Sequence, residues 1–598
     1  MTDRRPVLTL ETTLYAGLFL LALGLRLLNL GAHPLNDLEA REALTVLGRL
    51  RGAAPDAGLA PSSAAYFFFT FLAFLVAGAS DAAARFGPAL AGSVLVLAPI
   101  LFREHLGRAA ALTASALLAL STGLLAAARS ADGALFAVLG LAVAVGALGR
   151  HARGEGRAWL FISAAALGLG LAGGRTFVLG LLALVLTLLI LRWTQAERLA
   201  GLGPVWAGVW AERRAYGLTF LLSALLISTA GLTYLRGLGA LLDGLLRGLG
   251  GFVPGAGGRL PLEVLLFIMV DEPLLLVFGI AGAVRAFRTG SAFAQALAWF
   301  ALVALALVVL HSGRSLADVV WVSAPLALLA GWALVDLLEG LGERGEWGLA
   351  VTQGVVTLAL VGFALLNVAA LAELSERSPG GFTAFQTTIM GRVVEVPAMA
   401  QMGIVVLAVA LVFVIAYLLS LGWSARAARL GLVSAWAGVL AAATLGAGWG
   451  VTQARPGSPG ELWWARTASP EVPWLMDSLG AVSNYTVGNT TDVEVTVAAS
   501  PNGLLAWALR DFPNATFVDR LDPVIQSPVV IAPLSTEHPT LGSSYVGQDF
   551  FVNATWSLDL SVTEWVTWLA YRATPTLAAE PVILWVRQDV AQLQSTGE

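Results

Sequence analysis

Residues 12–41, TTLYAGLFLLALGLRLLNLGAHPLNDLEAR, join an apolar run to a polar motif and decide what kind of fold this chain adopts. A transmembrane helix needs about 20 predominantly apolar residues, which the stretch from Thr12 to Leu30 provides with a single charge, Arg26. The stretch has no small-residue cleavage site of the kind that ends a signal peptide, and it continues directly into His33-Pro-Leu-Asn-Asp37. We therefore expect the first membrane span at residues 12–30, with a folded loop after it.

The composition of the whole chain also indicates a membrane protein. Of its 598 residues, 57% are hydrophobic and 12% are charged, and the mean hydropathy is +0.78, whereas soluble domains contain about 25% charged residues. This balance excludes a water-soluble enzyme, and a net charge of -4 without a broad basic face gives no case for nucleic-acid binding. The absence of cysteine excludes disulfides and cysteine-based zinc sites.

Apolar runs of similar length recur as far as Gly450, and the remaining 148 residues are polar, proline-containing and rich in strand-forming residues. The pattern predicts a polytopic α-helical membrane protein of about 13 transmembrane helices, with a membrane domain at 1–450 and an extracytoplasmic α/β domain at 451–598. The expected spans lie at about 12–30, 87–102, 109–128, 133–149, 158–173, 176–192, 217–235, 273–288, 291–310, 317–337, 347–370, 399–420 and 427–450.

The topology depends on whether residues 64–79, AAYFFFTFLAFLVAGA, cross the membrane. This segment is short for a span and lies within the otherwise polar stretch 31–85. If it lies in the membrane interface, thirteen spans place the basic loops around Arg150 and at 192–214 in the cytoplasm, as the positive-inside rule requires. We therefore expect a cytoplasmic N-terminus, an extracytoplasmic tail and a structured outside loop at 31–86. The alternative count reverses every later loop.

Short segments of the tail alternate between helical and strand character. Helices are expected at 470–481 and 503–511, and strands at 493–498 and at 528–533, PVVIAP, which has proline at both ends. An interfacial helix is also expected outside the membrane at 236–251.

Ionisable residues near membrane spans are costly and often functional, and here they gather at the expected outer ends. The first group follows span 1 and contains His33, Asp37, Glu39 and Arg41, and the second is the turn Arg129-Ser-Ala-Asp132. Such acids can simply cap helices, with Asp37 as an N-cap. Alternatively, Asp37, Glu39 or Asp132 removes a proton from an acceptor hydroxyl or amine at the water boundary.

The third group is cationic and lies in turns between long apolar spans. Arg175 follows Gly173-Gly174, and Arg314 ends His311-Ser-Gly-Arg314. Each arginine could extend to the lipid headgroups or bind a phosphate, as could Arg41 and Arg129. Asp271 and Glu272 precede Pro273 at the start of a span, where Asp271 is a natural helix cap. We regard His33, His311, Asp271 and Glu272 as accessory candidates.

Acids beside arginines on an outer membrane face suit a polyprenyl-phosphate sugar. The arginines would hold the phosphate leaving group, and a carboxylate would activate an extracytoplasmic glycan, lipid or protein acceptor. No cofactor is indicated with certainty, although Asp37 and Asp132 could contribute oxygen ligands to Mg²⁺ or Mn²⁺. No glycine-rich phosphate loop for a cytoplasmic nucleotide is present.

Several short motifs carry a likeness to a known superfamily. They are Leu25-Arg26-Leu-Leu-Asn-Leu30, His33-Pro-Leu-Asn-Asp37-Leu-Glu39-Ala-Arg41, Arg85-Phe-Gly-Pro, the Ala-Arg-Ser-Ala-Asp132 turn and Gly174-Arg175-Thr176. With this arrangement the chain resembles the GT-C membrane glycosyltransferases, which include protein O-mannosyltransferases, aminoarabinose-lipid transferases and oligosaccharyltransferases. Within them it looks most like the prokaryotic flippase-activity-associated proteins, through Trp507-Ala-Leu-Arg510-Asp511, Val529–Pro533 and Tyr545-Val-Gly547.

The resemblance implies a transferase that uses a polyprenyl-phosphate sugar, but the chain departs from the family pattern in the first loop. Leu38 stands where the family has an aspartate, and Asp37 lies one residue earlier. Either Asp37 has taken over the role or catalysis is reduced or lost. Trp463-Trp464 is followed by Ala465-Arg466 instead of the Asp-Tyr-Gly typical of oligosaccharyltransferases. A noncatalytic partner in lipid-linked sugar translocation and a transporter are the alternatives.

Overall fold

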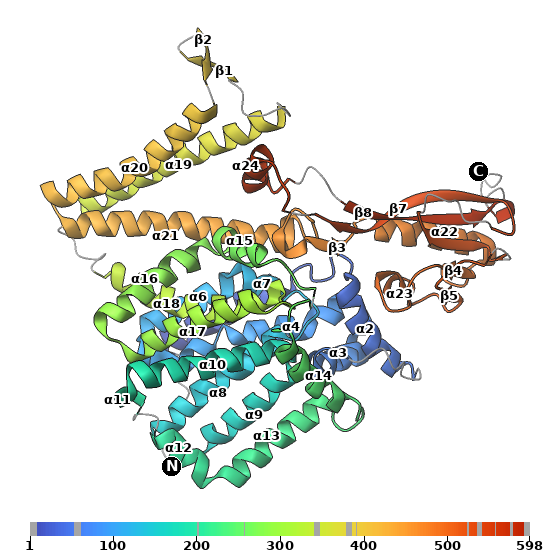
Figure 1. The fold of residues 1–598 in the computed structure, drawn as a ribbon, viewed down its shortest axis with the longest axis horizontal. Helices are drawn as coiled ribbons and strands as arrows, with labels where there is room; N and C mark the ends of the chain where they lie inside the picture. The colour runs from blue at the N-terminus through green and yellow to red at the C-terminus, as the bar shows by residue number, and fades with distance from the viewer. Residues whose placement is uncertain are drawn as a thin grey trace.

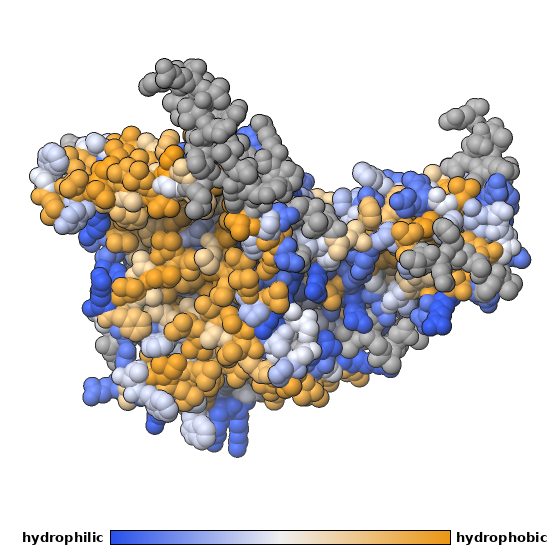
Figure 2. Space-filling model, turned by 45° about the horizontal axis from the view of Figure 1, so that its top comes forward, coloured by the Kyte–Doolittle hydropathy of each residue, from blue (hydrophilic) through white to orange (hydrophobic). Residues whose placement is uncertain are grey.

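The computed structural model describes residues 9–52, 61–199, 203–255, 257–339, 347–377, 385–389, 392–396, 398–522, 525–534, 541–556, 558–573 and 578–590. A large bundle of helices carries a smaller sheet-containing part at one end (Figure 1). The surface of the bundle is largely hydrophobic in the view of Figure 2, whereas hydrophilic residues are frequent on the C-terminal part. This division is the one expected of a helical membrane domain beside a domain in water.

Nine helical stretches within the described residues are long and apolar enough to cross a membrane, which confirms a polytopic helical membrane protein. They are α1 (Leu10–Leu27), α4 (Asp81–Leu95) continued by η1 (Ala98–Phe102) and α5 (Arg103–Leu106), α8 (Ala134–Ala152), α10 (Arg175–Thr194), α17 (Ala292–Leu310), η3 (Leu316–Val319) with α18 (Val320–Leu337), α19 (Trp347–Arg377), α20 (Ala398–Gly422), and α21 (Ala425–Trp449) with η4 (Gly450–Ala454). A tenth is the pair α15 (Pro261–Asp271) and α16 (Pro273–Thr289), which is bent by 91°.

Three further expected spans form shorter helices. They are α6 (Arg108–Leu120), followed by α7 (Thr122–Ala127), then α9 (Ala158–Ala172) and α13 (Arg213–Ser228), and the connecting helices α11 (Ala196–Leu199) and α12 (Gly203–Ala211) lie between the last two. Helices of 13 to 16 residues extend about 20–24 Å, less than the hydrocarbon core of about 30 Å. Every expected span is therefore helical, and the exact number of crossings stays a prediction.

The loop after α1, for which a folded structure is expected, contains two helices, α2 (Asp37–Leu50) and α3 (Ala64–Ala77). The expectation that Asp37 caps α2 is wrong. Asn36 is the N-cap, because its side chain accepts hydrogen bonds from the backbone N–H groups of Leu38 and Glu39, and the Glu39 carboxylate bonds back to the N–H of Asn36. This leaves the Asp37 carboxylate free to contact other parts of the chain. The expected outer helix at 236–251 is α14 (Gly237–Gly250).

The tail contains a six-stranded mixed sheet in the order β3-β7-β8-β6-β4-β5. Its strands are β3 (Arg466–Ala468), β4 (Val495–Val497), β5 (Ala515–Phe517), β6 (Val529–Pro533), β7 (Tyr545–Thr555) and β8 (Ala578–Arg587), and its helices are η5 (Leu462–Trp464), α22 (Val472–Val487), α23 (Leu504–Ala508) and α24 (Val562–Tyr571). β4 pairs in parallel with β5 and β6, and the remaining pairs are antiparallel. All four tail segments assigned from the sequence have the expected type. A hairpin of β1 (Phe385–Ile389) and β2 (Arg392–Val396) lies between α19 and α20.

Contacts between the first loop and the tail constrain the topology. The Asp37 carboxylate accepts a hydrogen bond from the backbone N–H of Leu504 at 2.8 Å, and the Trp507 indole donates to Asp81 at 2.5 Å. Residues in contact in this way lie on one side of a membrane, so the chain crosses an even number of times between them. Asp37 precedes α3 and Asp81 follows it, and both contact α23 of the tail, so α3 does not separate them across a membrane. The structure therefore favours an interfacial position for α3.

Candidate functional site

The predicted carboxylate Glu39 forms a buried ion pair. Its two oxygens accept hydrogen bonds from the Arg85 guanidinium at 3.2 and 2.7 Å, and both side chains are buried. The backbone N–H of Ala131 also donates to Glu39, at 2.9 Å. Glu39 thus connects α2 to α4 and to the turn that carries Asp132. These contacts favour a positioning role over proton transfer.

The predicted phosphate ligand Arg129 is also used internally. Its guanidinium donates to the carbonyl oxygens of Arg26, Leu28 and Asn29 at 2.6–3.0 Å, and the residue is 1% exposed. These carbonyls belong to the C-terminal end of α1, where backbone acceptors lack helical partners. Arg129 therefore closes the end of the first span, and it presents no exposed surface to a lipid phosphate.

Asp37 contacts the tail with both oxygens. One accepts from the backbone N–H of Leu504, and the other accepts from the side-chain amide of Asn553 at 2.8 Å. The carboxylate is on the surface, and Arg41, one turn later, is also exposed. The structure therefore places Asp37 at the junction of the first loop and the tail.

His33 is buried, and neither of its ring nitrogens has a hydrogen-bond partner among the described residues. Its ring meets the edge of Trp464 with the ring centroids 4.5 Å apart. Burial lowers the pKa of His33 well below its ordinary value, and the charges of Arg85 and Arg129 act in the same direction. His33 is therefore a neutral imidazole that packs the end of α1 against the tail.

A different group of predicted residues converges at the turn after α7. Gly133 lies so close to its neighbours that a Cβ atom there would be 2.3 Å from both the Gly173 carbonyl oxygen and the Ser63 hydroxyl. Gly174 has φ +86°, and a Cβ atom there would be 2.5 Å from the Ser62 carbonyl oxygen. These contacts bring Asp132, Arg175 and the start of α3 together. We use the name Asp132–Arg175 cluster for Asp132, Arg175 and Asp318, whose charges act on one another, together with Glu42 and Arg314, which are joined to them through Ser62 and Gly313.

Arg175 is held by residues of η3 and of the loop before it. Its guanidinium donates to the Gly313 carbonyl oxygen at 2.8 Å, to the Ser315 hydroxyl at 2.8 Å and to the Asp318 carboxylate at 3.1 Å. Asp318 is fully buried, whereas the Arg175 side chain is 26% exposed. Three of the five N–H groups of a guanidinium are thus engaged, which leaves two for a ligand.

The second predicted cation, Arg314, lies directly after the Gly313 carbonyl that Arg175 contacts. Arg314 donates to the carbonyl oxygen of Arg259, and the backbone N–H of Arg259 donates to the Arg314 carbonyl at 3.0 Å. The buried Nε of Arg314 has no partner among the described residues. The two predicted arginines therefore meet at the loop before η3, which carries Arg314 and contacts Arg175 through Gly313. Arg259 lies beside Arg314.

Two acids of the Asp132–Arg175 cluster have altered proton affinity. Burial raises the pKa of Asp132 to about 7, against a hydrogen bond from the Ala134 N–H, and the charge of Asp318 raises it further. Burial also raises the pKa of Glu42 to about 7, although Ser62 donates its backbone N–H to both Glu42 oxygens. A carboxyl with a pKa near 7 can accept a proton and return it at neutral pH.

The remaining accessory candidates, His311, Asp271 and Glu272, are not members of the Asp132–Arg175 cluster. His311 is buried, with Nε2 3.2 Å from the Gly248 carbonyl oxygen. Asp271 pairs with Arg572 of the tail at 2.7 Å and makes no cap contact, so its expected capping role is wrong. Glu272 is the N-cap residue of α16 and accepts from Ser121 at 2.5 Å and from the Gly123 N–H at 2.8 Å. Asp271 and Glu272 thus lie at the bend between α15 and α16 and bind it to the tail and to α7, respectively.

Sequence reasoning missed three residues of this region, Glu42, Arg259 and Asp318, and it noted Arg85 only as part of a family motif, without a role in the site. Asp318 belongs to Ser315-Leu-Ala-Asp318, which has the form of a capping box, and the structure contains that box. The same carboxylate also binds Arg175, which no local pattern indicates. Glu42 lies one turn after Glu39 on α2, and this spacing was the available signal for a second acid.

A metal site is not supported by the residues that the structure describes. No group of three or more histidine, aspartate or glutamate side chains in the described ranges is arranged to hold a metal ion. The oxygens of Asp37 are occupied by the tail, and the near neighbours of Asp132 include a guanidinium.

No family model matches the sequence, and no curated protein matches it. The structure is similar to that of ArnT from Cupriavidus metallidurans bound to undecaprenyl phosphate, with 16% identity, a TM-score of 0.45 and coverage of 84% of each chain. It is also similar to the Archaeoglobus fulgidus oligosaccharyltransferase, with 14% identity, a TM-score of 0.44 and coverage of 85% of this chain and 64% of that one.

Proposed function

We propose that this chain is a membrane glycosyltransferase that moves a sugar from a polyprenyl-phosphate donor to an extracytoplasmic acceptor. The observation that carries the proposal is the Asp132–Arg175 cluster, in which a carboxyl with a pKa near 7 lies close to a guanidinium with free N–H groups. Both residues stand at ends of apolar helices, where a lipid phosphate meets water. The motifs shared with the GT-C superfamily support the same activity.

Arg175 is the proposed contact of the donor phosphate. A guanidinium binds phosphate oxygens through charge-assisted hydrogen bonds, and Asp318 fixes its orientation through the ion pair at 3.1 Å. Arg314 is the proposed second contact, because it follows the Gly313 carbonyl that holds Arg175. Their positive charges stabilise the negative charge that develops on the phosphate as it leaves.

Asp132 is the proposed general base. The acceptor oxygen attacks the anomeric carbon of the sugar, and the bond between that carbon and the phosphate oxygen breaks. The proton of the acceptor hydroxyl passes to the Asp132 carboxylate, and the electron pair of the broken bond remains on the lipid phosphate. Glu42 lies in the same cluster and is the proposed second acid, which can relay that proton to water.

The remaining predicted residues position these groups. Glu39 and Arg85 hold the turn that carries Asp132, through the hydrogen bond from the Ala131 N–H. Asp37 holds the tail over the first loop. On this proposal residues 1–450 form the membrane domain, residues 451–598 form the extracytoplasmic domain, and the N-terminus is cytoplasmic.

The decisive experiment is a transfer assay with purified protein, polyprenyl-phosphate sugars and membrane-derived acceptors. The parent should form a glycosylated product, and Asp132→Asn should lower the rate by about 10²–10⁴, the usual size of general-base catalysis. Asp519→Asn, an exposed substitution in the tail, is the control. If the parent protein transfers no sugar from any polyprenyl donor, the proposal fails, and the alternative of a noncatalytic partner in sugar translocation takes its place.

A further inference from the structure

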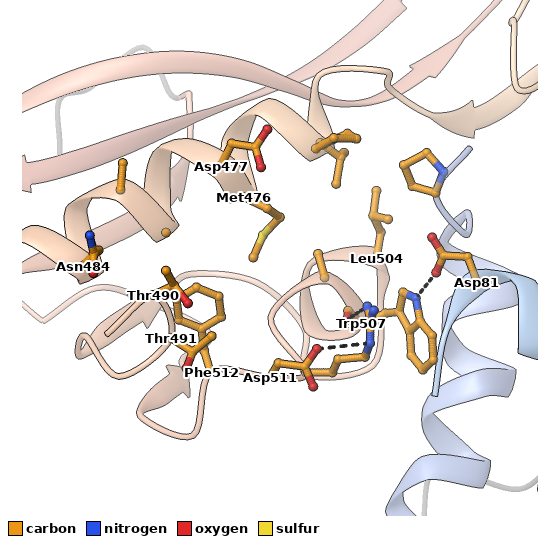
Figure 3. A pocket seen from close by; sticks show the side chains of 17 residues that line it. Asp81, Met476, Asp477, Asn484, Thr490, Thr491, Leu504, Trp507, Asp511 and Phe512 are labelled. Carbon is orange, nitrogen blue, oxygen red and sulfur yellow. Dashed lines mark hydrogen bonds and ion pairs between the residues drawn. The ribbon is translucent and has the colours of Figure 1, made fainter. Parts of the chain in front are cut away.

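A cavity of about 560 Å³ lies between the tail and the first outside loop. Figure 3 shows α22 along one wall, α23 and the chain after it along the opposite wall, and Asp81 of the membrane part at one end. The volume is within the range of about 300–1,000 Å³ that is typical of small-molecule sites. The cavity is separate from the Asp132–Arg175 cluster, which contributes no residue to its lining.

The polar groups around the cavity include both hydrogen-bond donors and acceptors. Carboxylates come from Asp81, Asp477 and Asp511, a guanidinium from Arg510, an amide from Asn484 and hydroxyls from Thr490 and Thr491. Asp477 and Asn484 lie on one face of α22, and no side-chain partner for either is found among the described residues. Sugar hydroxyls both donate and accept, so they can be satisfied by such a mixed set.

Apolar side chains provide the other part of the lining. Met476 and Phe512 border the cavity, and Gly480, Ala481 and Ala508 leave room because their side chains are small. Trp507 closes one end and is itself buried, since its indole donates to Asp81 and its ring carries the Arg510 guanidinium 4.5 Å from the centroid. A sugar ring, with an apolar face and polar edges, matches this arrangement.

We infer that this cavity binds a saccharide, and that on the proposed function the saccharide is part of the acceptor. The lining has three carboxylates and the Arg510 guanidinium, and Arg51 pairs with Asp511 at 3.4 Å, so the carboxylates still outnumber the cations and disfavour a phosphate or another anion. No residue of a strand lines the cavity, so it offers no sheet edge to an extended peptide. A hydroxyl-rich ligand without negative charge fits the charge of the lining and its mixture of polar and apolar side chains.

The cavity is connected to the first loop through Leu504. This residue lines the cavity, and its backbone N–H donates to the Asp37 carboxylate. Pro34 and Asp81 of the first loop and of α4 also reach the lining. A saccharide held here would therefore lie beside the acidic motif that follows the first span, on the side of the membrane where the acceptor is expected.

Saccharide binding can be measured without the lipid donor. We would record saturation-transfer NMR of the full chain in lipid nanodiscs with maltose, cellobiose, chitobiose and mannobiose. At least one disaccharide should give a signal with the parent, and Gly480→Met should reduce that signal at least fivefold. Gly480 is on α22, and a Cβ atom there would have only the Thr490 carbonyl oxygen within 4 Å, at 3.7 Å. Methionine also favours a helix over glycine, so the variant fills the cavity without weakening α22.

A second variant and a control separate binding from folding. Asp477→Asn removes an unpaired carboxylate of the lining and should weaken binding at least fivefold, whereas Asp519→Asn, exposed outside the cavity, should bind like the parent. No signal from any disaccharide, or an equal signal in a folded Gly480→Met protein, overturns the inference. Because the donor is absent, a chain that binds a disaccharide but transfers no sugar would contradict the proposed function and leave the saccharide site in place.

Discussion

The Arg85 guanidinium binds both oxygens of the Glu39 carboxylate, and both side chains are buried. Arg85 also donates to the carbonyl oxygens of His33 at 2.9 Å and of Pro34 at 3.3 Å. A single ion pair therefore connects α2, α4 and the segment after α1, and Glu39 extends the connection to the Ala131 N–H. The turn that carries Asp132 depends on this pair for its position.

Removing one member of this pair should be strongly destabilising. Arg85→Ala leaves the Glu39 charge buried without its partner, a change that typically costs about 3–5 kcal/mol. We expect a lower unfolding temperature and loss of transfer together. Glu39→Gln keeps the size and some hydrogen bonds, so it should lose less stability than Arg85→Ala. The unfolding temperatures of the parent and both variants in nanodiscs test this order. An Arg85→Ala protein as stable as the parent would show that the ion pair does not stabilise the fold.

The proton affinity of Asp132 predicts the pH dependence of transfer. A general base acts in its deprotonated form, so kcat/KM should rise with pH around a midpoint near 7, the raised pKa of Asp132. Glu42, whose pKa is also raised to about 7, can contribute to the same rise. Asp132→Asn should lower the rate and abolish the Asp132 component of the profile. An unchanged midpoint in both Asp132→Asn and Glu42→Gln would remove these acids from the mechanism.

The same shift has a consequence for stability. The folded chain binds the Asp132 proton more tightly than the unfolded chain does. Protonation of Asp132 therefore stabilises the fold fully at a pH below the pKa that Asp132 has in the unfolded chain, and this stabilisation is lost as the pH rises through about 7. Asp132→Asn removes this loss. The unfolding temperature of Asp132→Asn minus that of the parent should therefore be larger at pH 8 than at pH 5. The opposite order would show that the pKa of Asp132 is not raised.

The sequence alone predicted the class of fold and most element positions because these depend on local signals. Apolar length identified the helices of the membrane part, and the proline-bounded run 528–533 identified β6. The long strands β7 and β8 and the helix α24 were not predicted. Burial alternates along the inner parts of both strands, with Val552 and Leu584 among the buried positions. The positions between the buried ones include Phe551, Ile583 and Trp585, so apolar residues on both faces hide the two-residue period in the sequence.

The candidate site was predicted only in part, because its contacts join distant residues. Asp132 and Arg175 were found from their place in turns between spans. Asp318, 143 residues after Arg175 (318 minus 175), is brought to it by the packing of α10 and α18. Likewise, the carbonyl oxygens that occupy Arg129 lie about 100 residues earlier. Residue type identified charged groups, but only the tertiary structure distinguishes the partly exposed Arg175 from the buried Arg129.

Arg175 and Arg314 should control donor binding. Arg175→Ala removes charge-assisted contacts that are typically worth about 1.5–3 kcal/mol, so the KM for the polyprenyl-phosphate sugar should rise about 10- to 150-fold. Arg314→Ala should act in the same direction. Arg288→Ala, an exposed arginine at the end of α16, is a matched control. Unchanged lipid affinity in both site variants would assign these arginines to packing and headgroup contact.

Asp318→Asn tests whether Asp318 acts through Arg175. The substitution keeps the hydrogen bond to Ser315 but removes the charge that orients the guanidinium. We expect a higher donor KM with a smaller change in kcat, and no further loss when Asp318→Asn is added to Arg175→Ala. Additive losses in the double variant would mean that Asp318 has a separate role.

The orientation in the membrane can be measured with single cysteines, because the chain has none of its own. A cysteine near Arg150 should react with membrane-impermeant reagents only from the cytoplasm. Cysteines at Asp477 and at Leu38, which is 76% exposed, should both react from outside. The last two positions belong to segments that contact one another, so labelling from opposite sides would contradict the docking of the tail on the first loop.

Asp37 offers the final test, because docking and catalysis predict different results. Asp37→Asn keeps an acceptor for the Leu504 N–H but turns an amide N–H₂ towards the amide of Asn553, where the carboxylate accepted a hydrogen bond. If Asp37 docks the tail, proteolysis between the membrane part and the tail should accelerate while transfer falls less than about tenfold. If Asp37 is the base, transfer should fall by about 10²–10⁴ with unchanged proteolysis. We expect the first result, since both Asp37 oxygens are already bound by the tail, whereas Asp132 has the raised pKa. The Asn553→Asp variant places a second carboxylate against Asp37 and should reproduce the accelerated proteolysis without touching the base.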